Sequence, residues 1–165
     1  MADAVAQQRA WDVLRAVPDP EIPVLSIVDL GIVRSVDTDC ARSVRVGISP
    51  TYMGCPATAF IRASVVDALG EAGFEPVEVF NLLSPPWSSD DISEQGREKL
   101  RAYGIAPPAR AVHSPKGLTH GEHEPACPRC DSNKTERLSE FGSTPCKALY
   151  RCRECLEPFD YFKCL

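Results

Sequence analysis

Two Cys-x-x-Cys units near the C-terminal end constrain the fold of this chain more than any other feature. Cys127 and Cys130 form the first unit, and Cys152 and Cys155 form the second. Each unit directs two thiolates at one point, and two units together complete a tetrahedral shell of four sulfur atoms for zinc. The tail is too short to fold on an apolar core alone, so we expect metal binding to contribute about 10 kcal/mol or more. The spacing therefore predicts a zinc ribbon.

Iron is the alternative metal, because soft thiolates also bind a rubredoxin-like iron centre or a labile cluster. Zinc is favoured because four protein ligands close its coordination shell. A closed shell leaves no position for a substrate, so we expect the ion to be structural.

Cys146 and Cys164 are the remaining cysteines of the tail. The segments flanking the second unit have strand patterns. If they pair antiparallel with Cys152 opposite Pro158, then Cys146 faces Cys164 at a separation that a disulfide or a shared metal ion could bridge. A register shift of one residue would remove this second thiol pair, and simple packing of two small apolar side chains is the alternative.

The residues before the tail predict an α+β domain, with a small sheet and helices packed on one face. Apolar periodicity and turn residues indicate the order helix, strand, strand, helix, strand, helix, at residues 3–17, 26–36, 42–49, 57–69, 75–82 and 92–103. A segment rich in proline and glycine follows and reads as a linker. We expect domains at 1–108 and 125–165, joined by a linker at 109–124.

Residues 49–56, Ser-Pro-Thr-Tyr-Met-Gly-Cys-Pro, lie between a predicted strand and a predicted helix. Pro56 suits the first helical position, which would make Cys55 the cap residue. The positive end of the helix dipole would favour ionisation of its thiol, giving a nucleophile or a metal ligand. Thr51 could add a hydroxyl group. The alternative is a buried cysteine at a strand–helix junction.

Asp19 and Glu21 lie in a proline-rich acidic loop, Asp-Pro-Glu-Ile-Pro. Two carboxylates on such a stiff backbone could hold a metal ion, accept hydrogen bonds or cap a neighbouring helix. A solvated turn is the alternative.

Composition excludes several functional classes. The net charge of −5 argues against broad binding of nucleic acid or of anionic membranes. The chain has no apolar run long enough to span a bilayer and no signal-peptide pattern at its start. We therefore expect a cytoplasmic protein that binds neither nucleic acid nor membrane.

Several short motifs together resemble a known family. They are Asp19-Pro20-Glu21-Ile22-Pro23, Asp29-Leu30-Gly31, Thr51-x-x-Gly54-Cys55-Pro56, Pro85-Pro86-Trp87 and Gly104-Ile105-Ala106-Pro107-Pro108. In order and spacing, about residues 8–108 resemble the SufT-like, MIP-type domain of iron–sulfur assembly proteins. The tail from Phe141 to Cys164 resembles the extension of the PaaD family, which belongs to the phenylacetyl-CoA ring-epoxidase system of bacterial phenylacetate degradation.

This resemblance implies an α+β fold and a maturation role rather than an enzymatic one. The family's reactive-cysteine loop maps onto Thr51 and Cys55, and its acidic loop onto Asp19 and Glu21. The chain lacks the Glu-x-x-His pattern of a di-iron oxygenase bundle.

We therefore expect an accessory protein that assists iron–sulfur cluster assembly or repair in the reductase component of the epoxidase. Its partners would be that reductase and other iron–sulfur assembly proteins. Its cofactors would be zinc and a transient cluster or iron, and a homodimer or a shared ligand is implied because one thiolate cannot hold a cluster alone. The alternative is a non-catalytic adaptor subunit of the multicomponent oxygenase complex.

Overall fold

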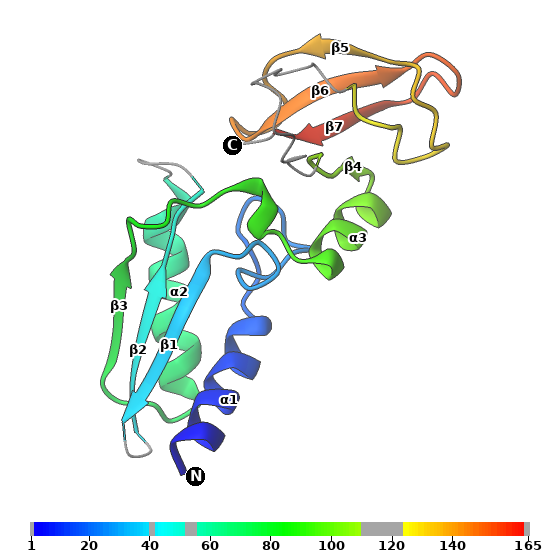
Figure 1. Cartoon of the computed structure of the whole chain (residues 1–165). Helices are drawn as coiled ribbons and strands as arrows, with labels where there is room; N and C mark the ends of the chain where they lie inside the picture. The colour runs from blue at the N-terminus through cyan, green and yellow to red at the C-terminus, as the bar shows by residue number, and fades with distance from the viewer. Residues whose placement is uncertain (1, 40–41, 52–55, 110–123, 164–165) are drawn as a thin grey trace, which may run out of the picture. The chain divides into compact units, whose positions relative to one another are not determined.

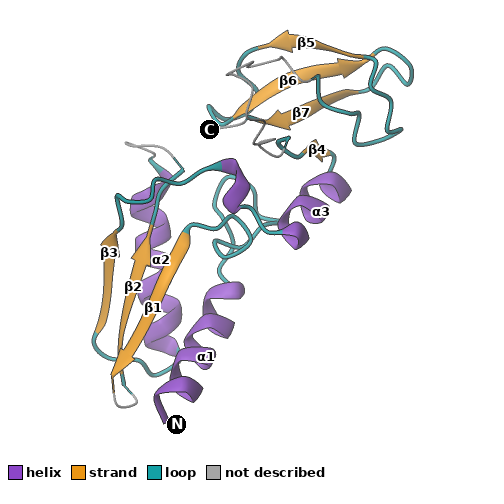
Figure 2. Ribbon diagram, in the orientation of Figure 1, coloured by secondary structure: helices purple, strands orange, loops and turns teal. Residues whose placement is uncertain are grey.

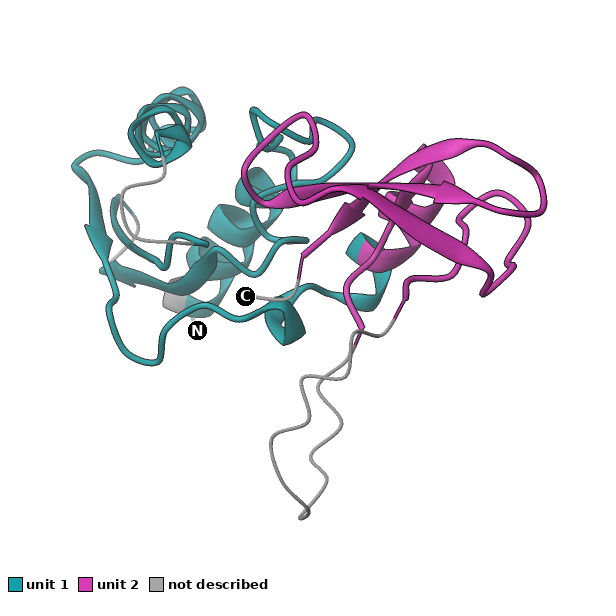
Figure 3. Ribbon diagram, turned by 90° about the horizontal axis from the view of Figure 1, so that it is seen from above, with its two compact units in different colours: residues 1–96, 165 teal, residues 97–164 magenta. Residues whose placement is uncertain are grey.

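The chain forms two compact units (Figures 1 and 3). The computed structural model describes residues 2–39, 42–51, 56–109 and 124–163. The first unit is Met1–Gly96 and the second is Arg97–Cys164. In the part of the chain that is described, no helix has the length and apolar composition needed to cross a lipid bilayer.

The first unit confirms the predicted α+β fold and its element order. Its elements are α1 (Ala2–Arg15), β1 (Val33–Asp39), β2 (Ser43–Ile48), α2 (Ala57–Glu71), β3 (Val77–Asn81), the 3₁₀ turn η1 (Ser89–Asp91) and the start of α3 (Glu94–Tyr103). The sheet has the order β1-β2-β3, with β2 antiparallel to β1 and parallel to β3. α1 contacts β1, α2 contacts β3, and the two helices contact each other, so both cover one face of the sheet (Figure 2).

The core of this unit lies between that face and the helices. Val46 of β2 is fully buried and lies between Val36 of β1 and Val79 of β3. α2 turns one stripe towards the strands, formed by Ile61, Val65 and Leu69. The alternation of period two in the strands and the spacing of three to four residues in α2 explain why these elements form where they do.

β2, α2 and β3 form a β-α-β unit with parallel strands. The carboxyl ends of β2 and β3 lie at the same edge of the sheet, because the Leu82 N–H donates to the carbonyl of Ile48. The Ser49 N–H donates to the carbonyl of Ile32, which brings the entry to β1 to this edge as well. Loops at the carboxyl ends of parallel strands are the usual location of ligand sites in such units.

The predicted strand at 26–36 is wrong in its first half, because β1 begins only at Val33. Ser26 and Asp29 form two reciprocal hydrogen bonds between side chain and backbone, of 2.9 and 3.0 Å. Gly31 then adopts a left-handed conformation with φ of 69°. Local side-chain hydrogen bonds of this kind compete with strand pairing, so the segment forms turns.

The second unit contains a four-stranded sheet with the order β4-β7-β6-β5. Its strands are β4 (Ile105–Ala106), β5 (Thr135–Ser139), β6 (Lys147–Cys152) and β7 (Pro158–Phe162). β6 is antiparallel to both β5 and β7, whereas β4 pairs parallel to β7. Its small core includes a cluster of Ala106, Cys127, Ala148, Tyr150, Cys152 and Phe159.

The predicted register of the β6–β7 hairpin is wrong by one residue. Arg151, not Cys152, lies opposite Pro158, and the Lys163 N–H donates to the carbonyl of Cys146 at 2.9 Å. The shift arises because the Cys152 N–H donates to the carbonyl of Glu157 and closes the turn one residue earlier. The register therefore gives no support to a Cys146–Cys164 pair, and Cys164 itself lies outside the described residues.

The compact units divide at Gly96, whereas the sequence indicates a first domain over 1–108. The difference comes from β4, because Ile105 pairs with Asp160 of β7 and draws this segment into the second unit. Most of the expected linker at 109–124 lies outside the described residues. The division into domains at 1–108 and 125–165 stays a prediction.

Candidate functional site

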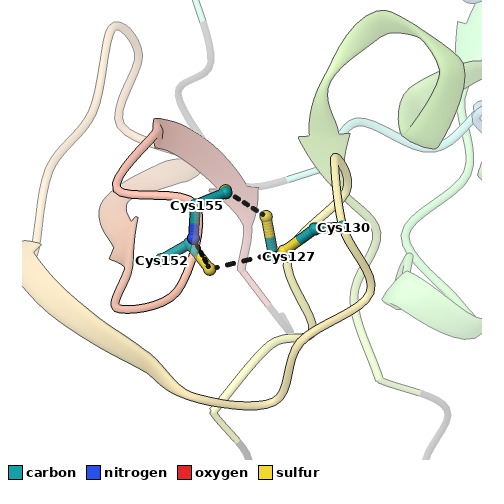
Figure 4. Close-up of side chains that lie close together, drawn as sticks. All are labelled: Cys127, Cys130, Cys152 and Cys155. Atoms are coloured by element: carbon teal, nitrogen blue, oxygen red, sulfur yellow. Dashed lines mark hydrogen bonds between the residues drawn. The ribbon is translucent and has the colours of Figure 1, made fainter.

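Four thiols converge in the second unit. The sulfur atoms of Cys127, Cys130, Cys152 and Cys155 all lie within 4.8 Å of one another. Cys127 and Cys130 come from the turn before β5, and Cys152 and Cys155 come from the end of β6 and the turn that follows it (Figure 4). These are the four residues that the Cys-x-x-Cys spacing predicts as metal ligands.

The distances between the sulfur atoms match a tetrahedral metal site. The Cys127 and Cys155 sulfur atoms are 3.7 Å apart, and those of Cys130 and Cys152 are 3.6 Å apart. A tetrahedron with zinc–sulfur bonds of about 2.3 Å has edges of about 3.8 Å. The donor set therefore fits zinc, which would be held by four thiolates with no position left for a substrate.

The two turns have the same local fold. In each, the first cysteine accepts a hydrogen bond at its sulfur from the backbone N–H two residues later, from Arg129 and from Glu154, both at 3.4 Å. The residue after each second cysteine has a left-handed backbone, with φ of 57° at Asp131 and 64° at Leu156. The equivalence of the turns explains how two separated segments present their sulfur atoms in the same way.

Backbone donors and neighbouring thiols set the charge of this site. The backbone N–H of Cys155, followed by that of Glu154, lowers the pKa of Cys152 to about 6. A backbone hydrogen bond at Ser132 also lowers the pKa of Cys130, but burial and the neighbouring thiols outweigh it and raise the pKa to about 12. Four adjacent thiolates repel one another, so a divalent cation is needed to hold all of them ionised.

Cys146 lies apart from this cluster. Its side chain is buried, and its sulfur lies 3.1 Å from the Thr144 hydroxyl oxygen. The next residue, Lys147, is also buried, and its ammonium nitrogen lies 3.4 Å from a carboxylate oxygen of Asp160. The Ser143 hydroxyl donates to the same oxygen. This buried ion pair was not expected from the sequence, because Lys147 follows no pattern that separates it from a surface lysine.

In the acidic loop, Asp19 is a structural residue. Its side chain is 6% exposed, and its Oδ1 accepts hydrogen bonds from the backbone N–H groups of Glu21 and Ile22 at 2.9 and 2.8 Å. The hydrogen-bonding role that the sequence allowed is therefore observed. Glu21 is half-buried.

Thr51 is the last described residue of the loop that leaves β2, and it is half-buried. Cys55 lies outside the described residues. α2 begins at Ala57, as predicted, but its cap residue is Pro56, one residue after the predicted cap, and no described side chain caps this helix end. The structure describes only the two ends of this loop, at Thr51 and at the start of α2.

Comparison with known proteins gives two family matches, on different parts of the chain. Residues 7–79 match the family described as iron–sulfur cluster assembly protein. Residues 111–163 match the PaaD zinc β-ribbon domain. A crystal structure of a domain of unknown function, DUF59, from Bacillus anthracis covers 61% of this chain and 95% of its own, with a TM-score of 0.57 and 28% identity.

Two relatives are similar over different lengths. An "Fe-S protein maturation auxiliary factor" of Porphyromonas gingivalis is 35% identical over 88 residues, 53% of this chain and 83% of its own. A "Putative 1,2-phenylacetyl-CoA epoxidase" subunit of Escherichia coli K12 is 50% identical over 156 residues, 94% of this chain and 91% of its own. The chain therefore belongs to the PaaD family, and its iron–sulfur assembly domain precedes a zinc ribbon that contains four converging cysteines.

Proposed function

We propose that this protein assists the assembly or repair of an iron–sulfur cluster in the reductase component of a phenylacetyl-CoA epoxidase. One observation carries the proposal: a single chain joins an iron–sulfur assembly domain to the ribbon of the PaaD family and resembles a phenylacetyl-CoA epoxidase subunit over almost its whole length. A relative described as an iron–sulfur maturation factor matches about half of this chain, and the iron–sulfur assembly family matches residues 7–79, within the first unit. Both support assigning the maturation chemistry to that unit.

The loop between β2 and α2 is the proposed site of that chemistry. It leaves the carboxyl edge of two parallel strands and ends at the start of a helix with no side-chain cap. In our proposal Cys55 binds iron, a cluster or a thiol of the client, and Thr51 adds a hydroxyl group at the loop entrance. Because one thiolate cannot hold a cluster alone, the remaining ligands come from the client or from a second copy of the chain.

Asp19 and Glu21 take different parts in this proposal. Asp19 already accepts two backbone hydrogen bonds, so it maintains the shape of the acidic loop. Glu21 is half-buried, and in our proposal its carboxylate helps to shape the pocket. The ribbon binds the client, since its four-thiolate shell leaves no position for catalysis.

Cluster content of the reductase tests the proposal. The reductase is expressed with the full chain, without it, with Cys55→Ser, or with Cys40→Ser as a matched loss of a cysteine outside the proposed loop. Iron and acid-labile sulfide are then measured per reductase. We expect cluster occupancy to fall several-fold without the chain or with Cys55→Ser, and to stay normal with Cys40→Ser. Equal occupancy in all four preparations would sink the proposal.

A second candidate is an adaptor subunit that holds the epoxidase components together. The closed metal shell of the ribbon favours it, because such a site only shapes a binding surface. Epoxidation that needs the chain but is unaffected by Cys55→Ser, with a fully loaded reductase, would select this candidate.

A further inference from the structure

α2 carries apolar residues on two opposite sides. Its buried stripe of Ile61, Val65 and Leu69 faces the core. α2 forms a single layer over the sheet. On its opposite side, the side chain of Phe60 is 60% exposed and that of Val66 is 41% exposed, although large apolar side chains are usually buried. A surface helix normally carries polar and charged residues on the side opposite its buried stripe, so exposed apolar residues on this side of α2 favour a binding surface.

The outer face of α2 consists mainly of small and apolar residues, with one carboxylate among them: Ala59, Phe60, Ala63, Val66, Asp67 and Gly70. Ala59, Ala63 and Gly70 are exposed and lie along one side of the helix. Small side chains in such a row allow a second helix backbone to approach closely, while Phe60 and Val66 flank the row. The shape therefore suits another helix better than a small molecule.

The charges at the two ends of α2 indicate which helix could pack on this face. The last turns of α2 contain no basic residue, but they carry the exposed carboxylates of Asp67 and Glu71. The first turn has no acidic residue and no side-chain cap. Both ends are therefore unfavourable for the helix dipole, which prefers acidic groups at the start and basic groups at the end.

We propose that the outer face of α2 is a self-association surface on which a second copy of the chain packs its own α2 in the antiparallel direction. With the two-fold axis at Ala63, Phe60 lies at the level of the partner's Val66. Asp67 then lies at the level of the partner's Ala59 in the first helical turn, and Glu71 lies just before that turn. The carboxylates of each copy compensate the uncapped helix start of the other.

The interface is self-complementary, which is why a second copy fits it. Each copy contributes one large and one smaller apolar side chain on either side of a row of small residues. A single helix face buries less than the ~1,000 Å² that stable interfaces exceed, so we expect association in the micromolar range. This inference does not depend on the maturation role.

Sedimentation equilibrium of the zinc-loaded full chain, from about 1 to 500 µM, tests the inference. We expect a reversible monomer–dimer equilibrium that Phe60→Glu weakens by about tenfold or more. Val5→Glu is the matched control, because Val5 is an exposed apolar residue of α1, 72% accessible, outside the proposed surface. It is expected to leave the equilibrium unchanged.

Charge reversal at Glu71 separates an effect on self-association from an effect on the stability of α2 itself. Glu71→Lys improves the fit of α2 to its own dipole, so we expect an unchanged or higher melting temperature but weaker association. Glu98→Lys on α3 makes the same change in net charge and is expected to have no effect on association.

Three results would overturn self-association through α2. The chain could remain monomeric at every concentration, or it could form a dimer that Phe60→Glu does not weaken. In the third, the chain is monomeric, yet Phe60→Glu lowers cluster occupancy of the reductase, which would assign this face to a different protein.

Discussion

Asp19 shows how one carboxylate can maintain the conformation of a loop. From the sequence alone, the same loop resembles a functional site. Its two accepted hydrogen bonds satisfy backbone donors of Glu21 and Ile22, and Ile22 is itself buried. Loss of an acceptor at a buried position leaves its donors unsatisfied, and this costs more than the hydrogen bond itself contributes. The conformation of the acidic loop therefore depends on this side chain.

Replacing Asp19 tests this structural role. We expect Asp19→Ala to lower the free energy of unfolding by about 1–3 kcal/mol, because two N–H groups lose their acceptor. Asp19→Asn keeps an acceptor oxygen and should cost less. Glu21→Gln serves as the control and should have little effect on stability. Urea unfolding followed by tryptophan fluorescence measures all three. An Asp19→Ala variant as stable as the wild type would show that the carboxylate serves chemistry instead of the loop.

At the scale of the elements, the order of helices and strands was predictable from periodicity and turn residues. The convergence of the four cysteine sulfur atoms was predictable from spacing alone, since Cys-x-x-Cys turns have a fixed geometry. The start of β1 was not predictable, because the reciprocal Ser26–Asp29 hydrogen bonds depend on a backbone conformation that the residue types allow but do not require.

The hairpin register and the tertiary ion pairs were also beyond the reach of the sequence. The register depends on a single hydrogen bond from the Cys152 N–H to the Glu157 carbonyl. A shift of one residue changes every pair of residues that face each other across the two strands. Arg34 of β1 and Asp91 of η1 are far apart in the chain, yet they form two parallel hydrogen bonds of 2.7 and 2.8 Å. No local pattern encodes such a contact.

The Arg34–Asp91 pair makes the stability of the first unit depend on pH. Burial alone would raise the pKa of Asp91, but the hydrogen bond from Arg34 and the backbone N–H of Ser88 outweigh burial and hold it below its ordinary value. A carboxyl whose pKa is lowered on folding stabilises the protein above its unfolded pKa of 3.8. That contribution is lost as the pH falls below 3.8 and through the lower pKa of the folded state.

We expect Asp91→Asn to be less stable than the wild type by about 1 kcal/mol at pH 7, because a partly exposed pair contributes modestly. This difference in the free energy of unfolding should shrink as the pH falls from about 4 to about 2, because the wild-type carboxyl then becomes protonated and loses its charge. Urea unfolding at several pH values measures this difference. Asp12→Asn is the control, because Asp12 forms an exposed ion pair with Arg15. A difference that is constant with pH would contradict the titration of Asp91.

At the scale of the whole molecule, the two units depend on different sources of stability. The first unit has a sheet covered by two helices and a continuous apolar core. The core cluster described in the second unit is small, and it includes two of the four cysteines that converge, Cys127 and Cys152. Such a small core is not sufficient to fold without its metal ion, so zinc should control one unit and leave the other unaffected.

Chelation of zinc should therefore unfold the ribbon selectively. Both tryptophans, Trp11 and Trp87, lie in the first unit, so their fluorescence reports its unfolding, whereas the stacked Tyr150 and Phe159 report the ribbon through near-ultraviolet circular dichroism. We expect a chelator to abolish the ribbon signal and to leave the tryptophan transition within a few degrees of its original temperature. Cys155→Ser should reproduce the chelated state, and Cys40→Ser should behave as the wild type. If the tryptophan transition fell together with the ribbon signal, the two units would be one cooperative structure and the independence argued from their cores would be wrong.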